Sequence, residues 1–205
     1  MTKRALIIFT RNPILGQCKT RLAKTIGDKA ALDVYTFLLA HTAQITAPLD
    51  CDIFVYYSNE ISNNDCWNND RYKKRIQQGE DLGQRMQSAF QDQLDAGYSH
   101  ILLIGSDLYD LQTADLQLAF NKLDKNQTVL GPALDGGYYL IGLTQMIPQL
   151  FKNKPWGTNT VAAKTIEDLA KYDFELLELK NDIDYYQDMQ HIDALMAFVP
   201  TSLQP

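Results

Sequence analysis

Cysteine and histidine are scarce in this sequence of 205 residues, which has three of each. Cys18, Cys51 and Cys66 cannot all pair and form no C-x-x-C motif, so the sequence favours neither a disulfide framework nor a structural zinc site. The three histidines are far apart in the chain and supply no Ser-His-Asp or Cys-His arrangement. Thiol, zinc and triad chemistries therefore have no support.

Long apolar runs and an excess of positive charge are also missing. The run at residues 5–9 stops after five residues, too short for a signal peptide or a membrane span, so we expect a cytoplasmic protein. A formal net charge of −6 argues against a protein whose whole surface binds nucleic-acid phosphates. With 45% hydrophobic residues, we expect residues 1–205 to form a single domain with its own core.

The charges are unevenly distributed along the chain. Residues 1–27 contain six basic side chains and no acid, whereas residues 173–193 contain seven acids and a single lysine. A basic cluster and an acidic cluster at opposite ends suggest an anion held partly by cations and partly through a metal ion.

Short apolar or β-branched runs alternate with helical periodicity along the chain. Strands are expected at 5–10, 52–58, 101–104, 128–131, 138–143 and 174–179. Helices are expected from Asp28 to just before Pro48, over 82–94, from Thr113, from near Thr158, and over 185–198. This alternation predicts a three-layer α/β/α fold with a mostly parallel sheet and a site at the carboxyl ends of the strands.

The loop after the first strand carries three permanent cations, Arg11, Lys19 and Arg21, around Gly16. It differs from a P-loop, which has glycine directly before Lys-Thr, and the chain contains no G-x-G-x-x-G. The loop suits phosphate oxygens of a di- or triphosphate, and the alternative is a set of solvated surface cations.

Two acidic loops follow predicted strands and could supply hard oxygen ligands for Mg²⁺ or Mn²⁺. In the first, Asp107 is the expected metal ligand and Asp110 the expected helix cap. In the second, one of Asp182 and Asp184 is expected to bind metal while the other caps the last helix. Either loop could instead be only a helix cap or a surface acidic loop.

Paired glycines follow an acid in the segment 131–142. Asp135-Gly136-Gly137 permits close backbone approach to a ligand, and it is equally ordinary hairpin-turn chemistry.

Five motifs in order resemble one family, DUF2064, which belongs to the GT-A-like nucleotide-diphospho-sugar transferase superfamily; the likeness runs from about residue 5 to 189. The motifs are F-T-R-N-P-x-x-G-x-x-K-T-R-L (9–22), G-E-D-L-G-Q-R-M (79–86), L-L-I-G-S-D-x-x-x-L (102–111), L-G-P-A-x-D-G-G-Y-Y-L-I-G-L (130–143) and W-G-T (156–158).

The resemblance implies a GT-A-like fold and a set of site residues. Nucleotide phosphates would lie on the first loop, and the G-E-D-L segment would lie near the base or phosphates. The implied nucleotide-binding residues are Arg11, Gly16, Lys19, Arg21, Gly83 and Arg85. The implied metal ligands are Asp107 and Asp184, the latter matching the superfamily's later acid better than Asp182.

Three positions depart from the family pattern. Thr10 replaces the usual Ala and Tyr109 the usual Pro, and both leave the chemistry intact. Tyr185 stands where Thr usually follows the later acid, which weakens the match at Asp184.

The expected function is a metal-dependent transferase acting on an activated nucleotide, most specifically glycosyl transfer from a nucleoside-diphosphate sugar to a small acceptor. Lys19 and Asp107 would act electrostatically on the leaving group, and Asp135 would orient or deprotonate the acceptor. Gly136, Tyr138 and Trp156 would line the acceptor pocket. The alternatives are nucleotidyl transfer from a nucleoside triphosphate to a phosphorylated acceptor with loss of pyrophosphate, and a non-catalytic nucleotide-binding or regulatory protein.

Overall fold

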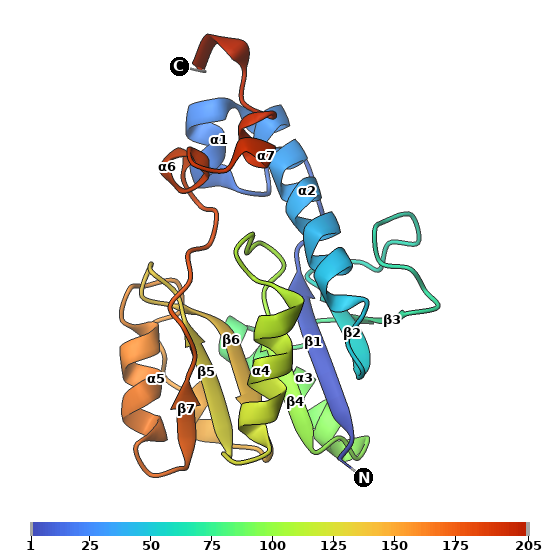
Figure 1. The fold of residues 1–205 in the computed structure, drawn as a ribbon, viewed down its shortest axis with the longest axis vertical. Helices are drawn as coiled ribbons and strands as arrows, with labels where there is room; N and C mark the ends of the chain where they lie inside the picture. The colour runs from blue at the N-terminus through green and yellow to red at the C-terminus, as the bar shows by residue number, and fades with distance from the viewer. Residues whose placement is uncertain (1, 204–205) are drawn as a thin grey trace.

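A computed structural model describes residues 2–203, and its centre is a seven-stranded sheet in the order β3-β2-β1-β4-β6-β5-β7. Only β6 runs antiparallel to its neighbours, β4 and β5, so the predicted α/β fold with a mostly parallel sheet is confirmed (Figure 1). The strands are β1 Arg4–Thr10, β2 Asp52–Tyr57, β3 Tyr72–Ile76, β4 His100–Ile104, β5 Thr128–Pro132, β6 Tyr138–Leu143 and β7 Phe174–Leu176.

Helices cover both faces of this sheet, because alternate strand residues are apolar on each face. Helices α2 and α4 pack on one face, and α3, η1 and α5 pack on the other. The helices are α1 Thr20–Ile26, α2 Asp28–Thr46, α3 Leu82–Asp95, α4 Thr113–Leu123, α5 Val161–Leu169, α6 Tyr186–Met189 and α7 Asp193–Met196, with 3₁₀ turns η1 Pro148–Phe151 and η2 Thr201–Leu203.

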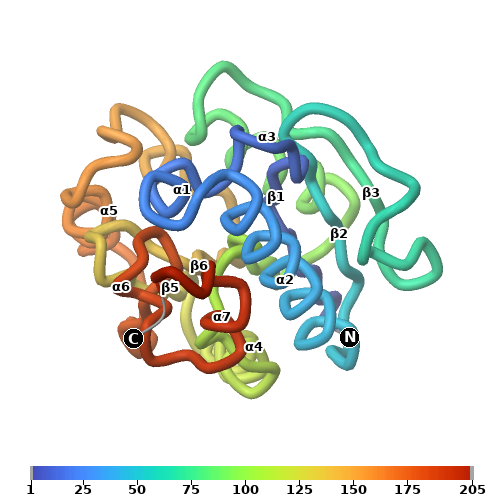
Figure 2. The backbone as a smooth tube through the Cα atoms, turned by 90° about the horizontal axis from the view of Figure 1, so that it is seen from above, coloured from blue at the N-terminus to red at the C-terminus, as the bar shows by residue number. Residues whose placement is uncertain are grey.

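A third apolar cluster lies above the carboxyl ends of the strands and joins the two ends of the chain. It is built from α1, the first half of α2, α6 and α7, with buried Leu22, Val34, Met189 and Leu195 among its members. Figures 1 and 2 show these helices grouped at the end of the molecule toward which β1 points. The packing brings the acidic C-terminal segment close to the basic N-terminal loop.

The structure corrects four expectations about local structure. The predicted loop after the first strand, which carries Arg11, Lys19 and Arg21, includes the start of α1, and β3 was not expected. The single helix predicted over 185–198 is wrong: Ile192 is extended, with φ −116° and ψ 93°, and separates α6 from α7. The last strand ends at Leu176, three residues earlier than expected.

No helix within residues 2–203 combines the length and apolar character that a membrane crossing requires.

Candidate functional site

The basic loop, residues 11–19, is held in shape by its own backbone and by a buried asparagine. The Asn12 side chain accepts hydrogen bonds from the amides of Asn59 (3.1 Å) and Glu60 (3.4 Å), and its Nδ2 donates to the Glu60 carbonyl (2.8 Å). The Cys18 thiol donates to the Asn12 carbonyl at 3.1 Å. Gly16 has φ 75°, a left-handed conformation that favours glycine.

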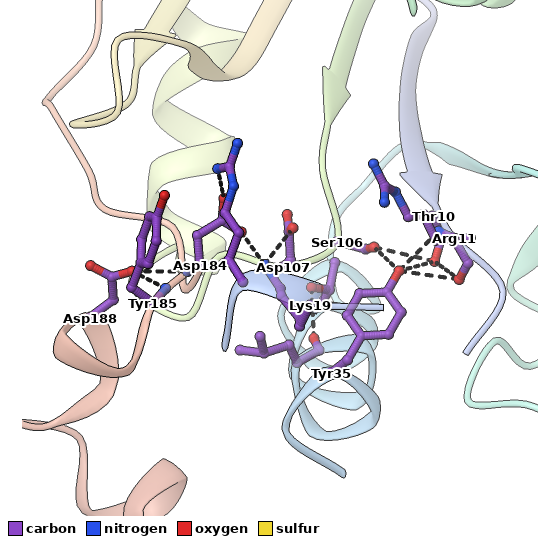
Figure 3. Close-up of polar contacts among 12 residues, drawn as sticks. Thr10, Arg11, Lys19, Tyr35, Ser106, Asp107, Asp184, Tyr185 and Asp188 are labelled. Atoms are coloured by element: carbon purple, nitrogen blue, oxygen red, sulfur yellow. Dashed lines mark hydrogen bonds and ion pairs between the residues drawn. The ribbon is translucent and has the colours of Figure 1, made fainter. Parts of the chain in front are cut away.

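A buried hydroxyl network fixes the start of this loop against the loop after β4 (Figure 3). Tyr35, from α2, accepts the Arg11 amide at 2.9 Å and donates to the Arg11 carbonyl at 3.2 Å. Its hydroxyl also lies 3.4 Å from Thr10 Oγ1 and 3.5 Å from Ser106 Oγ, which itself donates to Thr10 at 3.2 Å. Neighbouring Asp107 therefore has a fixed position relative to the basic loop.

Lys19 lies between the two acids that the sequence nominated as metal ligands (Figure 3). Its Nζ donates to Asp107 Oδ2 at 2.8 Å and to Asp184 Oδ1 at 3.0 Å. Burial alone would lower the pKa of the ammonium, but Asp107 and then Asp184 outweigh burial and raise the pKa. Burial opposes ionisation of Asp107 as well, and Lys19 and then Arg11 nevertheless keep its pKa below the ordinary value.

Asp184 reaches this position because the chain after β7 continues in the same direction past the carboxyl end of β5, where Lys180 pairs in parallel with Ala133 (Figure 1). The Ile183 amide donates to the Asp107 carbonyl at 3.5 Å, and the Ile183 side chain is buried in the third cluster. Arg21 Nη1 donates to Asp184 Oδ2 at 2.9 Å. The structure thus brings together Lys19, Arg21, Asp107 and Asp184. Lys19 and Arg21 contact Asp184 directly, and Asp107 joins them through Lys19.

The two expected caps are wrong. Helix α4 is capped by Gln112 and Asp115, whose carboxylate accepts the Gln112 amide at 2.8 Å, and Asp110 takes no part. Helix α6 is capped by Asp188, whose carboxylate accepts the amides of Asp184 (3.0 Å) and Tyr185 (2.6 Å). Neither Asp182 nor Asp184 is a cap, because a later carboxylate already satisfies those amides.

A cavity of about 120 Å³ lies beside the Lys19 bridge. Its lining is Gly105, Asp107, Leu108, Ala133, Asp135, Gly137, Tyr138, Tyr139 and Asp182. Three of these residues are acids from three different segments. Burial, and then Asp135, Asp107 and Asp184, raise the pKa of Asp182 to about 6. The cavity therefore has an acidic lining.

Asp135 both shapes a turn and faces this cavity. Its Oδ1 accepts the Gly137 amide at 2.7 Å, which is the turn geometry that Asp-Gly-Gly also predicts. Gly136 has φ 86°, and a Cβ there would lie 2.1 Å from the Asn159 carbonyl oxygen. The glycine is thus required by close packing on the segment before α5.

The remaining nominated residues lie around the start of α3. A Cβ on Gly83 would lie 2.2 Å from the Phe151 carbonyl and 2.7 Å from the Trp156 indole, so helix packing alone accounts for that glycine. Arg85 Nε donates to the Gly79 carbonyl at 3.0 Å. Tyr138 meets Trp156 edge-on with centroids 6.5 Å apart. Tyr138 also lines the cavity beside Asp107 and so links this group to the Lys19 bridge.

Two residues with clear positions in the site, Tyr35 and Asp188, were not nominated from the sequence. Tyr35 occupies the apolar stripe of α2 and resembles any core aromatic. Asp188 was counted only as part of the acidic run, although an acid at the third helical position is a recognised capping signal.

The carboxylates of Asp107 and Asp184 suit a divalent cation that also takes ligands from outside the protein. Asp107 and Asp184 are hard ligands, and Mg²⁺ commonly uses one or two carboxylates together with substrate phosphates. Within residues 2–203, no three His, Cys, Asp or Glu side chains are arranged to hold a metal ion by themselves. The residues therefore fit a metal whose remaining ligands come from phosphate and water.

Solved structures similar to this chain include three informative examples. A protein of Desulfovibrio desulfuricans G20, described as a "putative nucleotide-diphospho-sugar transferase", is 29% identical with TM-score 0.86, over 97% of this chain and 94% of that one. A cytidylyltransferase from Leptospira borgpetersenii serovar Hardjo-bovis is 12% identical with TM-score 0.61, over 98% and 89%. Rv0371c of Mycobacterium tuberculosis H37Rv in complex with manganese is 11% identical with TM-score 0.55, over 93% and 98%.

The two distant structures show a shared fold alone, whereas the first also shares sequence along nearly the whole chain. Comparison with curated proteins gives no match. The sequence profile of the family described as "Uncharacterized protein conserved in bacteria (DUF2064)" matches residues 41–158, more than half of the chain. The chain therefore belongs to the DUF2064 family, as its motifs predicted.

Proposed function

We propose that this protein is a transferase that uses an activated nucleotide, and that it transfers a glycosyl group from a nucleoside-diphosphate sugar to a small acceptor. The observation that carries the proposal is the meeting of the basic loop with Asp107 and Asp184 at the carboxyl edge of the sheet. The D. desulfuricans protein of similar sequence and fold supports the same class. Residues 1–205 would act as one transferase domain.

Three cations and one glycine would bind the diphosphate. Arg11 forms no ion pair within the described part of the chain, so its guanidinium is available for phosphate oxygens. Lys19 and Arg21 would add charge-assisted hydrogen bonds as negative charge builds on the leaving group. The left-handed turn at Gly16 lets the loop backbone approach the phosphates closely.

Asp107 and Asp184 would hold Mg²⁺ or Mn²⁺. A bound ion of this kind neutralises charge on a diphosphate leaving group. The manganese complex of Rv0371c supports the choice of cation within this fold.

The acceptor would lie near the cavity beside Asp107. Asp135 would orient the acceptor hydroxyl or take its proton, since its Oδ1 is already fixed by the Gly137 amide. Gly136, Tyr138 and Trp156 would border the acceptor. Gly83 and Arg85 would lie near the base or phosphates at the start of α3.

The test has two stages, and the first asks which ligands bind. Thermal shifts with nucleotides and sugar nucleotides, with and without Mg²⁺ or Mn²⁺, should identify a ligand; a hundredfold excess over Kd stabilises the folded state by about 2.7 kcal/mol. The matched control is Asp107→Asn, which keeps the side-chain size and removes the charge.

The second stage identifies the products. A free nucleoside diphosphate released from a sugar nucleotide supports glycosyl transfer. Release of pyrophosphate from a nucleoside triphosphate would instead indicate nucleotidyl transfer, which needs the same cations. Tight binding without either product would leave a nucleotide-binding protein and refute the transferase.

A further inference from the structure

Lys19 occupies the place between two carboxylates where a metal ligand pair would hold its ion. The lysine side chain is only 4% exposed, whereas those of Asp107 and Asp184 are 39% and 27% exposed. Its ammonium lies within 3.0 Å of one oxygen from each acid. A cation of the protein itself thus neutralises the proposed metal ligands.

The backbone at Lys19 is held in an unfavourable conformation to achieve this. Lys19 has φ 48° and ψ 44°, in the left-handed region that non-glycine residues rarely adopt. Helix α1 starts at the next residue, and the Cys18 thiol is fixed to the Asn12 carbonyl. Strain of this kind persists only where surrounding contacts compensate for it, and the two ion pairs supply the compensation.

We propose that Asp107 and Asp184 bind either the Lys19 ammonium or a divalent cation, and that Lys19, once displaced, turns to the nucleotide phosphates. The proposal rests on the proposed function, because it takes a divalent cation and phosphates as the ligands. The ammonium and the cation exclude each other, because the ammonium already holds Asp107 Oδ2 and Asp184 Oδ1. Two positive charges at a separation of a few ångströms also repel each other.

Two features favour an exchange over a permanent ion pair. Arg21 holds the other oxygen of Asp184 at 2.9 Å, so this acid keeps its position when Lys19 leaves. The lysine stem is a flexible four-carbon chain, unlike the planar fork of arginine. The free protein should therefore bind metal weakly. Metal and diphosphate should strengthen each other's binding, because the phosphate oxygens stabilise the displaced ammonium of Lys19.

The first experiment titrates MnCl₂ alone into wild type, Lys19→Met and Lys24→Met, with free Mn²⁺ measured by electron paramagnetic resonance. Lys24, an exposed lysine of the helix that begins directly after Lys19, gives the matched control. Lys19→Met should bind Mn²⁺ at least about tenfold more tightly than wild type, because a competing charge is gone. Lys24→Met should match wild type, and adding Asp107→Asn to Lys19→Met should abolish the gain. Equal or weaker binding by Lys19→Met, including no binding by either protein, would overturn the proposal.

The second experiment uses the wild-type protein and so does not depend on the variant's folding. Lysines are acetylated at low reagent concentration, and modification is followed by mass spectrometry with Lys24 as reference. Modification of Lys19 should be slow, rise severalfold with Mg²⁺, and fall again when inorganic pyrophosphate is added. A rate that Mg²⁺ leaves unchanged would overturn the exchange.

The two proposals fail in different ways. If Mn²⁺ and lysine reactivity behave as expected but no nucleotide binds, the transferase proposal fails and the exchange stands. If a nucleotide is turned over while Mg²⁺ leaves the acetylation rate of Lys19 unchanged, the exchange proposal fails and the transferase proposal stands.

Discussion

Replacing Tyr35 with phenylalanine tests whether one buried hydroxyl sets the position of the basic loop. The ring stays in the core, where Tyr35 is 4% exposed, so no cavity larger than one oxygen is created. The Arg11 amide loses its acceptor at 2.9 Å, and the Arg11 carbonyl loses a donor at 3.2 Å. Thr10 and Ser106 retain their mutual hydrogen bond.

The stability cost is dominated by the unsatisfied Arg11 amide. Leaving such a group without a partner costs about 1–3 kcal/mol of the free energy of unfolding. For a chain of this length, each kcal/mol lowers Tm by about 2–4 °C. We therefore expect Tyr35→Phe to lower Tm by about 2–12 °C and to weaken binding of a nucleoside diphosphate more than that of the parent nucleoside.

Tyr72→Phe is the matched control, because its hydroxyl is buried in the same cluster away from the site. Tyr72 donates to the Ala43 carbonyl at 2.6 Å, and that carbonyl also keeps its helical bond from Ala47. Its removal should cost about 1 kcal/mol and leave nucleotide affinity unchanged. Denaturant unfolding and titration calorimetry measure both quantities. Unchanged stability of Tyr35→Phe, or an equal loss of diphosphate affinity in Tyr72→Phe, would refute the reasoning.

Three further outcomes are expected. Asp107→Asn should weaken metal-dependent nucleotide binding, measured by calorimetry, while circular dichroism shows a folded protein; equal affinity with Mg²⁺ would remove its metal role. Asp184→Ala should reduce activity more than Asp182→Ala, and a reversed order at unchanged Tm would contradict the assignment. The Lys73 hydrogen bond and then Tyr98 lower the pKa of Asp52, so the stabilisation it gives is present above about pH 4 and is lost as pH falls further. The stability difference between wild type and Asp52→Asn should therefore shrink below pH 4 in denaturant titrations, and a constant difference would exclude this linkage.

Most of the strands that could be predicted are buried on both faces; the edge strand β7, expected over 174–179, is the exception. The run at residues 101–104 and its equivalents are almost wholly apolar, and only a sheet interior accommodates them. Strand β3, Tyr-Lys-Lys-Arg-Ile, was missed because it lies at the sheet edge and only Tyr72 is fully buried. Lys73 is exposed, and Lys74 is covered through its ion pair with Asp65, a contact that the local sequence does not indicate. The over-long last helix has a different cause: Met189, Leu195 and Val199 all face one cluster, although the extended Ile192 divides them into two helices.

The individual site residues could be nominated from the sequence, but their pairing could not. Asp107 follows a buried strand, a position where α/β sheets present ligands. Nothing local indicates that the ammonium of Lys19 reaches Asp184, 165 residues away, because this contact depends on how α1 and α6 pack together.

The packing of α1 against α6 also determines which kind of ion the free protein attracts. Charge patterning along the chain suggests an anion site at the basic loop, yet Lys19 and Arg21 are already paired with carboxylates. Asp135 and Asp182 add two acids close by, and burial and then the neighbouring carboxylates raise the pKa of Asp182 to about 6. With these pairs formed, we expect the site to attract a cation more strongly than a free phosphate. Under the proposed exchange, we expect a diphosphate to bind well only together with a divalent cation, which would compensate the acids and leave Arg11 and the displaced Lys19 for the phosphate oxygens.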